Sequence, residues 1–154
     1  MRSLWSQWPQ IRQRLAAKNL ILLFDFDGTL SPIAPRPSAA IFPAATRAAL
    51  LALSRSPRVT LGFVSGRILG ELRRLVRMKG VYLIGSHGWE WMAPDQVYRL
   101  RASAETLRHA RRMASQLRPA LRGLPGIWIE RKVVSVTVHY RGAGARSARA
   151  ARRN

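Results

Sequence analysis

Three short apolar segments separated by helical patterns are the feature that most constrains how this chain folds. The first, Leu20–Phe24, has no polar alternation, as expected of a parallel strand that is covered on both faces. Similar segments lie in RVTLGFV (58–64) and GVYLIG (80–85), and residues 44–55 and 68–78 between them have helical periodicity. We therefore predict an α/β fold with a parallel, Rossmann-like sheet, whose functional loops lie at the carboxyl ends of the strands.

The regions on either side of this core have different patterns. Apolar and aromatic residues at helical spacing predict that residues 1–18 form an amphipathic helix, which packs its aromatic side on the body. Residues 19–102 would form the partial core. Residues 103–141 would begin a small α+β cap domain, with one long helix before the two antiparallel strands of GIWIERK and VVSVTVHYR. Residues 142–154 contain only Arg, Gly, Ala, Ser and Asn and are expected to be disordered.

The composition of the 154-residue chain narrows its function. The formal net charge of +20 would favour binding to a polyanion. The arginines are scattered along the chain, however, so we expect no specific nucleic acid as partner. The absence of cysteine excludes disulfides and thiolate metal sites, so any metal must be bound by oxygen or imidazole. No apolar stretch approaches the ~20 residues of a membrane span, and the start lacks the apolar region of a secretory signal. We therefore expect a cytoplasmic protein with no membrane partner.

Two aspartates, Asp25 and Asp27, follow the first apolar segment, where buried carboxylates would need a counter-charge. In extended geometry their side chains project the same way, and Gly28 permits a sharp turn after them. A Mg²⁺ ion between the carboxylates would offset their repulsion. One aspartate could then attack phosphorus while the other acts as general acid and base. A pair of aspartates alone is just as typical of a loop or a helix cap, so only the neighbouring motifs can distinguish a catalytic pair from a structural one.

The motifs DFDGTL, VSGR and GSHGWE, in this order, resemble those of the haloacid dehalogenase phosphatases, and in particular those of the trehalose-6-phosphate phosphatases. The resemblance runs from about Leu20 to Arg141. It implies a haloacid-dehalogenase-like Rossmannoid parallel sheet, here partial, with the beginning of a small α+β cap domain. It also implies Mg²⁺-dependent hydrolysis of trehalose 6-phosphate to trehalose and phosphate through an aspartyl-phosphate. A related sugar phosphate or a phosphoprotein is the alternative substrate, because the first motif is shared across the superfamily.

The resemblance also implies roles for individual residues. Asp25 would be the nucleophile and Asp27 the general acid/base, with the Asp25 side chain and the Asp27 carbonyl on Mg²⁺. Ser65 and Gly66 would bind the transferring phosphoryl group. Six further residues would contact the sugar or its phosphate: Arg67, His87, Gly88, Glu90, Glu130 and Lys132. Other roles also suit these residue types: a helix N-cap for Ser65, a solvent-facing position for Arg67 and a surface salt bridge between Glu130 and Lys132.

The family pattern breaks after the cap strands. The resemblance implies a later lysine and a later acidic motif that completes the Mg²⁺ site, but no acidic residue follows Glu130 and no lysine follows Lys132. We expect later strands to be missing too, which leaves an exposed sheet edge. Because the resemblance stops at Gly142, a frameshift or premature end is the hypothesis and a natural Arg-rich tail the alternative. The chain would then be either an active phosphatase or a non-catalytic remnant that binds polyanions through its charge, and its oligomeric state is not predicted.

Overall fold

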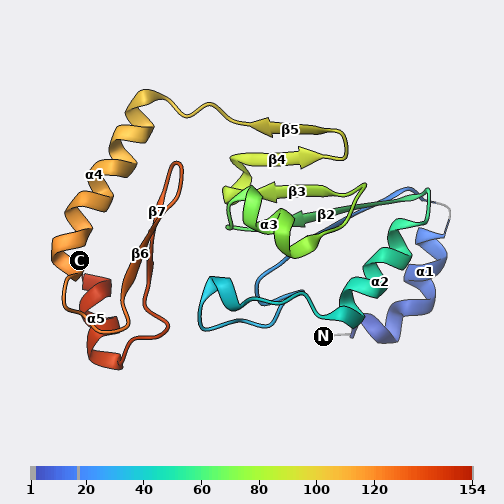
Figure 1. Cartoon of the computed structure of the whole chain (residues 1–154). Helices are drawn as coiled ribbons and strands as arrows, with labels where there is room; N and C mark the ends of the chain where they lie inside the picture. The colour runs from blue at the N-terminus through green and yellow to red at the C-terminus, as the bar shows by residue number, and fades with distance from the viewer. Residues whose placement is uncertain (1–2, 17, 154) are drawn as a thin grey trace. The chain divides into compact units, whose positions relative to one another are not determined.

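A computed structural model of the chain describes residues 3–16 and 18–153 (Figure 1). The chain divides into two compact units: unit 1 is Met1–Ile33 with Ala40–Tyr98, and unit 2 is Ala34–Ala39 with Arg99–Asn154. The main division after Tyr98 lies near the boundary predicted between core and cap. No helix in the described ranges is both long enough and apolar enough to cross a membrane.

Unit 1 contains a five-stranded sheet in the order β1-β2-β3-β4-β5. Its strands are β1 (Leu20–Asp25), β2 (Val59–Val64), β3 (Tyr82–Gly85), β4 (Glu90–Ala93) and β5 (Gln96–Arg99). The first three strands pair in parallel, which confirms the predicted α/β fold, whereas β4 pairs antiparallel with β3. The sheet is therefore mixed. Only a short 3₁₀ turn, η3 (Ser86–Gly88), separates β3 from β4, and a connection this short can join only antiparallel strands.

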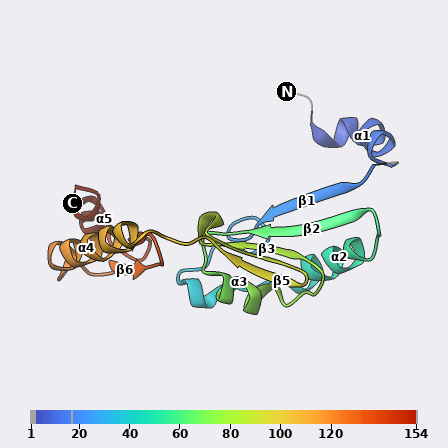
Figure 2. The ribbon, with the colours of Figure 1, turned by 90° about the horizontal axis from the view of Figure 1, so that it is seen from above.

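Two helices cover one face of this sheet. Helices α2 (Ala44–Ser54) and α3 (Leu69–Val76) lie on the same side of the strands in Figure 2. The core beneath them contains aromatic and aliphatic side chains that are almost wholly buried: Phe26, Leu61, Phe63, Leu72, Val76, Val81 and Leu83. Phe42 makes edge-to-face ring contacts with both Phe26 and Phe63, at centroid distances of 5.6 and 6.1 Å. Such contacts add to the free energy of burying the rings.

Strand β1 differs from its prediction. It lies at the edge of the sheet, and its side chains alternate between half-buried and exposed instead of being covered on both faces. Ile21 and Leu23 are 73% and 57% exposed. The prediction that both faces of β1 are covered is wrong, because α2 and α3 cover only one face of the sheet, and Ile21 and Leu23 lie on the other face. The predicted open edge is present: within residues 3–16 and 18–153, no strand pairs with the outer side of β1.

The amino-terminal segment forms a 3₁₀ turn, η1 (Leu4–Gln7), followed by α1 (Trp8–Leu15). Residues 1, 2 and 17 of the predicted helix lie outside the described residues. The prediction that the aromatic side packs on the body is wrong, because Trp5 is 75% exposed and α1 has no buried residue. The rings of Trp5 and Trp8 instead lie near each other, with centroids 6.2 Å apart.

Unit 2 contains η2 (Pro37–Ala39), α4 (Ala104–Leu121), the antiparallel strands β6 (Trp128–Arg131) and β7 (Val136–His139), and α5 (Ala145–Arg153). Helix α4 and the two strands are the elements that the sequence predicts. Helix α4 begins after Ser103, whose Oγ accepts a hydrogen bond from the Thr106 N–H and so caps the helix.

Helix α5 lies in a segment that the sequence analysis expects to be disordered. Its residues are almost all Ala and Arg, which have high helix propensity. The guanidinium of Arg152 also lies over the ring of Tyr140, 4.9 Å from its centroid. Low apolar content therefore does not prevent helix formation here, although no residue of α5 is buried. Asn154 lies outside the described residues.

Candidate active site

Asp25 and Asp27 lie at the carboxyl end of β1. Asp25 is the last residue of the strand, and both aspartates are exposed while Phe26 between them is fully buried. This alternation is consistent with two carboxylates on the same side of the chain. The expectation that they are buried is wrong, so neither needs a metal ion to offset the cost of burial. Thr29 Oγ1 donates a hydrogen bond to Asp25 Oδ2 at 2.9 Å.

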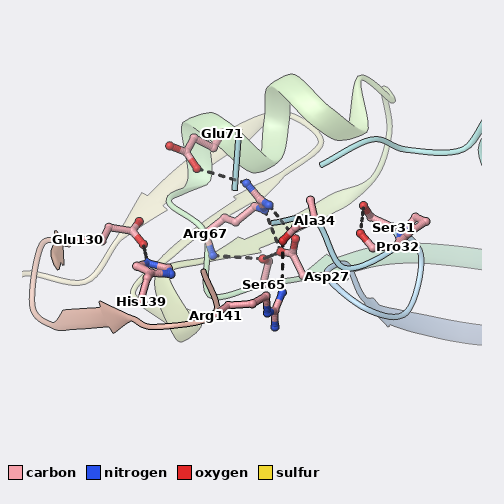
Figure 3. A network of polar contacts seen from close by, with 10 residues as sticks. All are labelled: Asp27, Ser31, Pro32, Ala34, Ser65, Arg67, Glu71, Glu130, His139 and Arg141. Atoms are coloured by element: carbon pink, nitrogen blue, oxygen red, sulfur yellow. Dashed lines mark hydrogen bonds and ion pairs between the residues drawn. The ribbon is translucent and has the colours of Figure 1, made fainter. Parts of the chain in front are cut away.

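The carboxylate of Asp27 is held by Arg67, as Figure 3 shows. Arg67 Nε donates to Asp27 Oδ2 at 2.8 Å, and Arg67 Nη2 donates to Asp27 Oδ1 at 2.7 Å. This is the two-pronged geometry in which a guanidinium both neutralises and orients a carboxylate. Because Arg67 is only 9% exposed, it is not a solvent-facing residue. Glu71, one helical turn further on, lies 3.6 Å from Arg67 Nη1.

Ser65 links the end of β2 to the same carboxylate. Its Oγ donates to Asp27 Oδ2 at 3.3 Å and accepts from the backbone N–H of Arg67 at 3.1 Å. The alternative role of Ser65 as a helix cap is wrong, because α3 begins only at Leu69 and its N-cap residue is Ile68. The SGR turn therefore places one hydroxyl and one guanidinium on Asp27, and the two motifs meet as the strand order requires.

Glu90 is bound to the backbone of the SGR–α3 segment. Its Oε2 accepts hydrogen bonds from the Leu69 N–H at 3.2 Å and from Ser86 Oγ at 2.9 Å. The Leu69 N–H is one of the groups at a helix start that has no partner within the helix, so Glu90 caps α3 from a different strand. Ser86 adds a second link, because its N–H donates to the Arg67 carbonyl at 2.6 Å. In these contacts Glu90 is a structural residue, whereas the resemblance implies a sugar contact.

His87 and Gly66 pack against each other. A Cβ atom added to Gly66 would lie 2.6 Å from His87 Cε1, so a larger residue there would force the imidazole to move. Both Ser86 and His87 adopt positive φ, 50° and 56°, a backbone conformation that is uncommon for residues other than glycine. The GSHGWE loop is therefore closely fitted to the SGR turn. Gly88, also at positive φ, ends this strained stretch.

We expect Glu90→Ala to lower the free energy of unfolding by about 1–2 kcal/mol, because the Leu69 N–H and Ser86 hydroxyl both lose their acceptor. Urea unfolding followed by circular dichroism would measure it. Glu90→Gln retains an acceptor oxygen and is the matched control, for which we expect a smaller loss. Equal stability of Glu90→Ala and the wild type would contradict the capping role.

In unit 2, Glu130 makes a hydrogen bond across the β6–β7 hairpin. Glu130 Oε2 lies 2.7 Å from His139 Nε2, and the His139 ring stacks on Trp128 with centroids 3.7 Å apart. Lys132 lies after the end of β6, and its backbone N–H donates to the Ser135 carbonyl. Glu130 and Lys132 are residues that the resemblance implies, whereas His139 and Trp128 were not predicted. Trp128 and His139 are directly opposite each other in the hairpin, so the strands and their register would have been enough to predict this contact.

The donor set near Asp25 fits part of a Mg²⁺ site. Mg²⁺ is commonly bound by one or two carboxylates together with water and substrate phosphate, and the exposed Asp25 carboxylate suits that arrangement. The Asp27 carboxylate is engaged by Arg67, so a contact from Asp27 would use its backbone carbonyl. Across residues 3–16 and 18–153, no group of three or more His, Asp or Glu side chains is arranged to hold a metal ion.

Comparison with known proteins identifies the family. The trehalose-phosphatase family model matches residues 23–154. The chain belongs to the trehalose-phosphatase family. A trehalose-phosphate phosphatase of Mycobacterium tuberculosis (strain ATCC 25618 / H37Rv) is 37% identical over 131 residues, which are 84% of this chain and 33% of the relative. An uncharacterized glycosyl hydrolase of M. tuberculosis (strain CDC 1551 / Oshkosh) is 38% identical over 87% of this chain and 10% of its own length.

A solved structure of the trehalose-6-phosphate phosphatase C-terminal domain from Candida albicans has a similar fold. It matches with a TM-score of 0.84 and 28% identity, over 94% of this chain and 51% of that chain. The fold is that of the haloacid dehalogenase-like hydrolases. The chain thus spans about a third of the curated trehalose-phosphate phosphatases and half of the matched domain.

The extent of the family match corrects one expectation. The match continues to residue 154, so the prediction that the resemblance stops at Gly142 is wrong. The frameshift hypothesis depended on that stop and loses its basis. The Arg- and Ala-rich segment is instead part of the family match and includes helix α5.

Proposed function

We propose that the chain hydrolyses trehalose 6-phosphate to trehalose and inorganic phosphate in a Mg²⁺-dependent reaction. The observation that carries the proposal is the meeting of the DxD and SGR motifs at one end of the sheet, where Ser65 and Arg67 both contact Asp27. The family match and the curated trehalose-phosphate phosphatases support this substrate. The exposed Asp25 is accessible to a phosphate ester.

In the proposed reaction an oxygen of Asp25 attacks phosphorus and the bond from phosphorus to the sugar oxygen breaks, so that the phosphoryl group is transferred to Asp25. Asp27 enters the first step protonated, gives that proton to the departing sugar oxygen and becomes the carboxylate that Arg67 holds; it later takes a proton from the water that hydrolyses the aspartyl-phosphate and so returns to its starting form. Arg67 and the Ser65 hydroxyl orient the Asp27 carboxylate for both steps. A bound Mg²⁺ would supply positive charge toward the phosphoryl oxygens.

Phosphate release from trehalose 6-phosphate by the purified chain tests this proposal. We expect release with millimolar Mg²⁺ and its loss on addition of EDTA, and slower release from glucose 6-phosphate and a phosphoserine peptide. A rate equal to that of buffer alone would overturn the proposal. A faster rate on one of the other two substrates would replace trehalose 6-phosphate with that alternative.

A second candidate is a basic protein that binds polyanions without catalysis. Unit 2 favours it, because Glu105 and Glu130 are the only acidic residues in its sequence while arginines occur along both α4 and α5. Non-specific binding to DNA would weaken steeply with salt. Salt-dependent retention on DNA, together with no phosphate release, would favour this function.

A further inference from the structure

Two neighbouring residues in the loop between β3 and β4, Ser86 and His87, have left-handed backbone although neither is glycine. Their φ angles are 50° and 56°, and Gly88 follows with φ 94°, so three consecutive residues have positive φ. For residues with a side chain this conformation costs free energy, which the surrounding contacts must offset. Strained backbone of this kind is concentrated at functional sites, and the contacts of Ser86 and His87 indicate what it positions.

The two strained residues hold the SGR turn by its backbone. The Ser86 N–H donates to the Arg67 carbonyl at 2.6 Å, and the His87 N–H donates to the Ser65 carbonyl at 3.3 Å. These carbonyls belong to the last and first residues of the turn, so the loop binds the turn at both ends. An extended backbone would point successive N–H groups in opposite directions, and only one of them could then reach the turn.

The side chains of the same two residues add to this contact. The His87 imidazole lies against Gly66, the middle residue of the turn, where an added Cβ atom would be 2.6 Å from Cε1 and 2.8 Å from Nε2. Ser86 Oγ donates to Glu90 Oε2, which also accepts from the Leu69 N–H just after the turn. The loop therefore contacts the turn at each of its three residues and at the start of the helix that follows.

We infer that Ser86 and His87 are positioning residues for Arg67. Their left-handed backbone fixes the SGR turn in the conformation that directs the guanidinium onto both oxygens of Asp27 (Figure 3). The same turn keeps Ser65 Oγ on Asp27 Oδ2. The inference rests on the proposed function in one respect, because the residue held in this way is the proposed general acid and base. For His87 it replaces the implied sugar contact with a role that acts through the turn.

Substitutions of His87 that differ in their tolerance of left-handed backbone test the inference. Asparagine and valine are similar in size and both remove the imidazole, but asparagine adopts positive φ far more readily than a β-branched residue does. His87→Asn and His87→Val are therefore the matched pair. His87→Gly is more tolerant than either, and His87→Ala lies between asparagine and valine. Because His87 is exposed, none of these substitutions creates a buried cavity.

The first readout is solvent exchange of the Arg67 Nε–H, measured by NMR on the full chain. This proton is bonded to Asp27 Oδ2 and should exchange slowly. We expect exchange close to that of the wild type in His87→Gly and His87→Asn, and exchange about tenfold faster or more in His87→Val. His87→Ala should lie between them, so it replaces His87→Val in the comparison if that variant does not fold. Equal exchange in the tolerant and intolerant variants would overturn the inference.

The second readout is phosphate release from trehalose 6-phosphate. We expect kcat to fall about tenfold or more in His87→Val with little change in KM, and to be retained in His87→Asn. A sugar contact made by the imidazole would instead raise KM alike in all the variants, and that result would overturn the inference. If the wild-type chain released no phosphate, the proposed function would fail, whereas the exchange of the Arg67 Nε–H would still decide the positioning role.

Discussion

We expect Asp25→Asn to abolish the release of phosphate from trehalose 6-phosphate, with a loss on the order of 10³-fold or more. The amide retains the size of the side chain and an acceptor for the Thr29 hydroxyl, but it is a poor nucleophile. It also removes the negative charge that a divalent cation would bind. Rates of phosphate release at saturating substrate, measured for variant and wild type side by side, would give the ratio.

Asp95→Asn is the control for this substitution, because Asp95 is an exposed carboxylate in the connection between β4 and β5. We expect it to retain the wild-type rate. The two variants should also unfold at the same temperature as the wild type, since the Asp25 side chain is exposed and its hydrogen bond comes from Thr29 in the same turn, a contact that asparagine can also accept. Full activity of a folded Asp25→Asn variant would remove Asp25 from the nucleophile role while leaving the family assignment intact.

Strand β1 shows which part of the fold the sequence determines. The uninterrupted apolar run of residues 20–24 correctly predicts a parallel strand followed by the aspartates. An apolar run, however, does not reveal whether a strand lies in the centre or at an edge of its sheet, because this depends on segments far away in the chain. The antiparallel β4–β5 pair was also missed, although the Pro-Asp turn between the two short strands could have indicated it.

The candidate site was predictable at the level of motifs and not at the level of contacts. The carboxyl ends of neighbouring parallel strands meet, so the order of the DxD and SGR motifs suffices to bring Asp27 near Ser65. The direction of the Arg67 side chain depends on the conformation of the turn after β2, which no local pattern fixes. For the same reason Glu90, which the motif resemblance places at the sugar, is found capping α3.

Gly85→Ala should reduce the stability of unit 1 more than any other small substitution in the GSHGWE loop. Gly85 has ordinary extended backbone, φ −107°, so alanine is allowed by conformation and excluded by space. A Cβ atom there would lie 2.7 Å from the Leu69 nitrogen, 2.9 Å from the Leu69 Cα and 3.0 Å from the Arg67 carbonyl oxygen. All three atoms belong to backbone, so no side chain can move aside to relieve the clash.

The expected cost of Gly85→Ala is on the order of 3 kcal/mol, because overpacking against fixed atoms would displace the start of α3 and the SGR turn together. Gly70→Ala is the matched control: Gly70 is in α3 and an added Cβ would meet nothing within 4 Å, so alanine should stabilise slightly through its helix propensity. Thermal and urea unfolding of both variants would measure the difference. If Gly85→Ala unfolded like the wild type, the distance between β3 and the start of α3 would have to be larger in solution than these contacts indicate. The SGR turn would then not depend on the GSHGWE loop for its position.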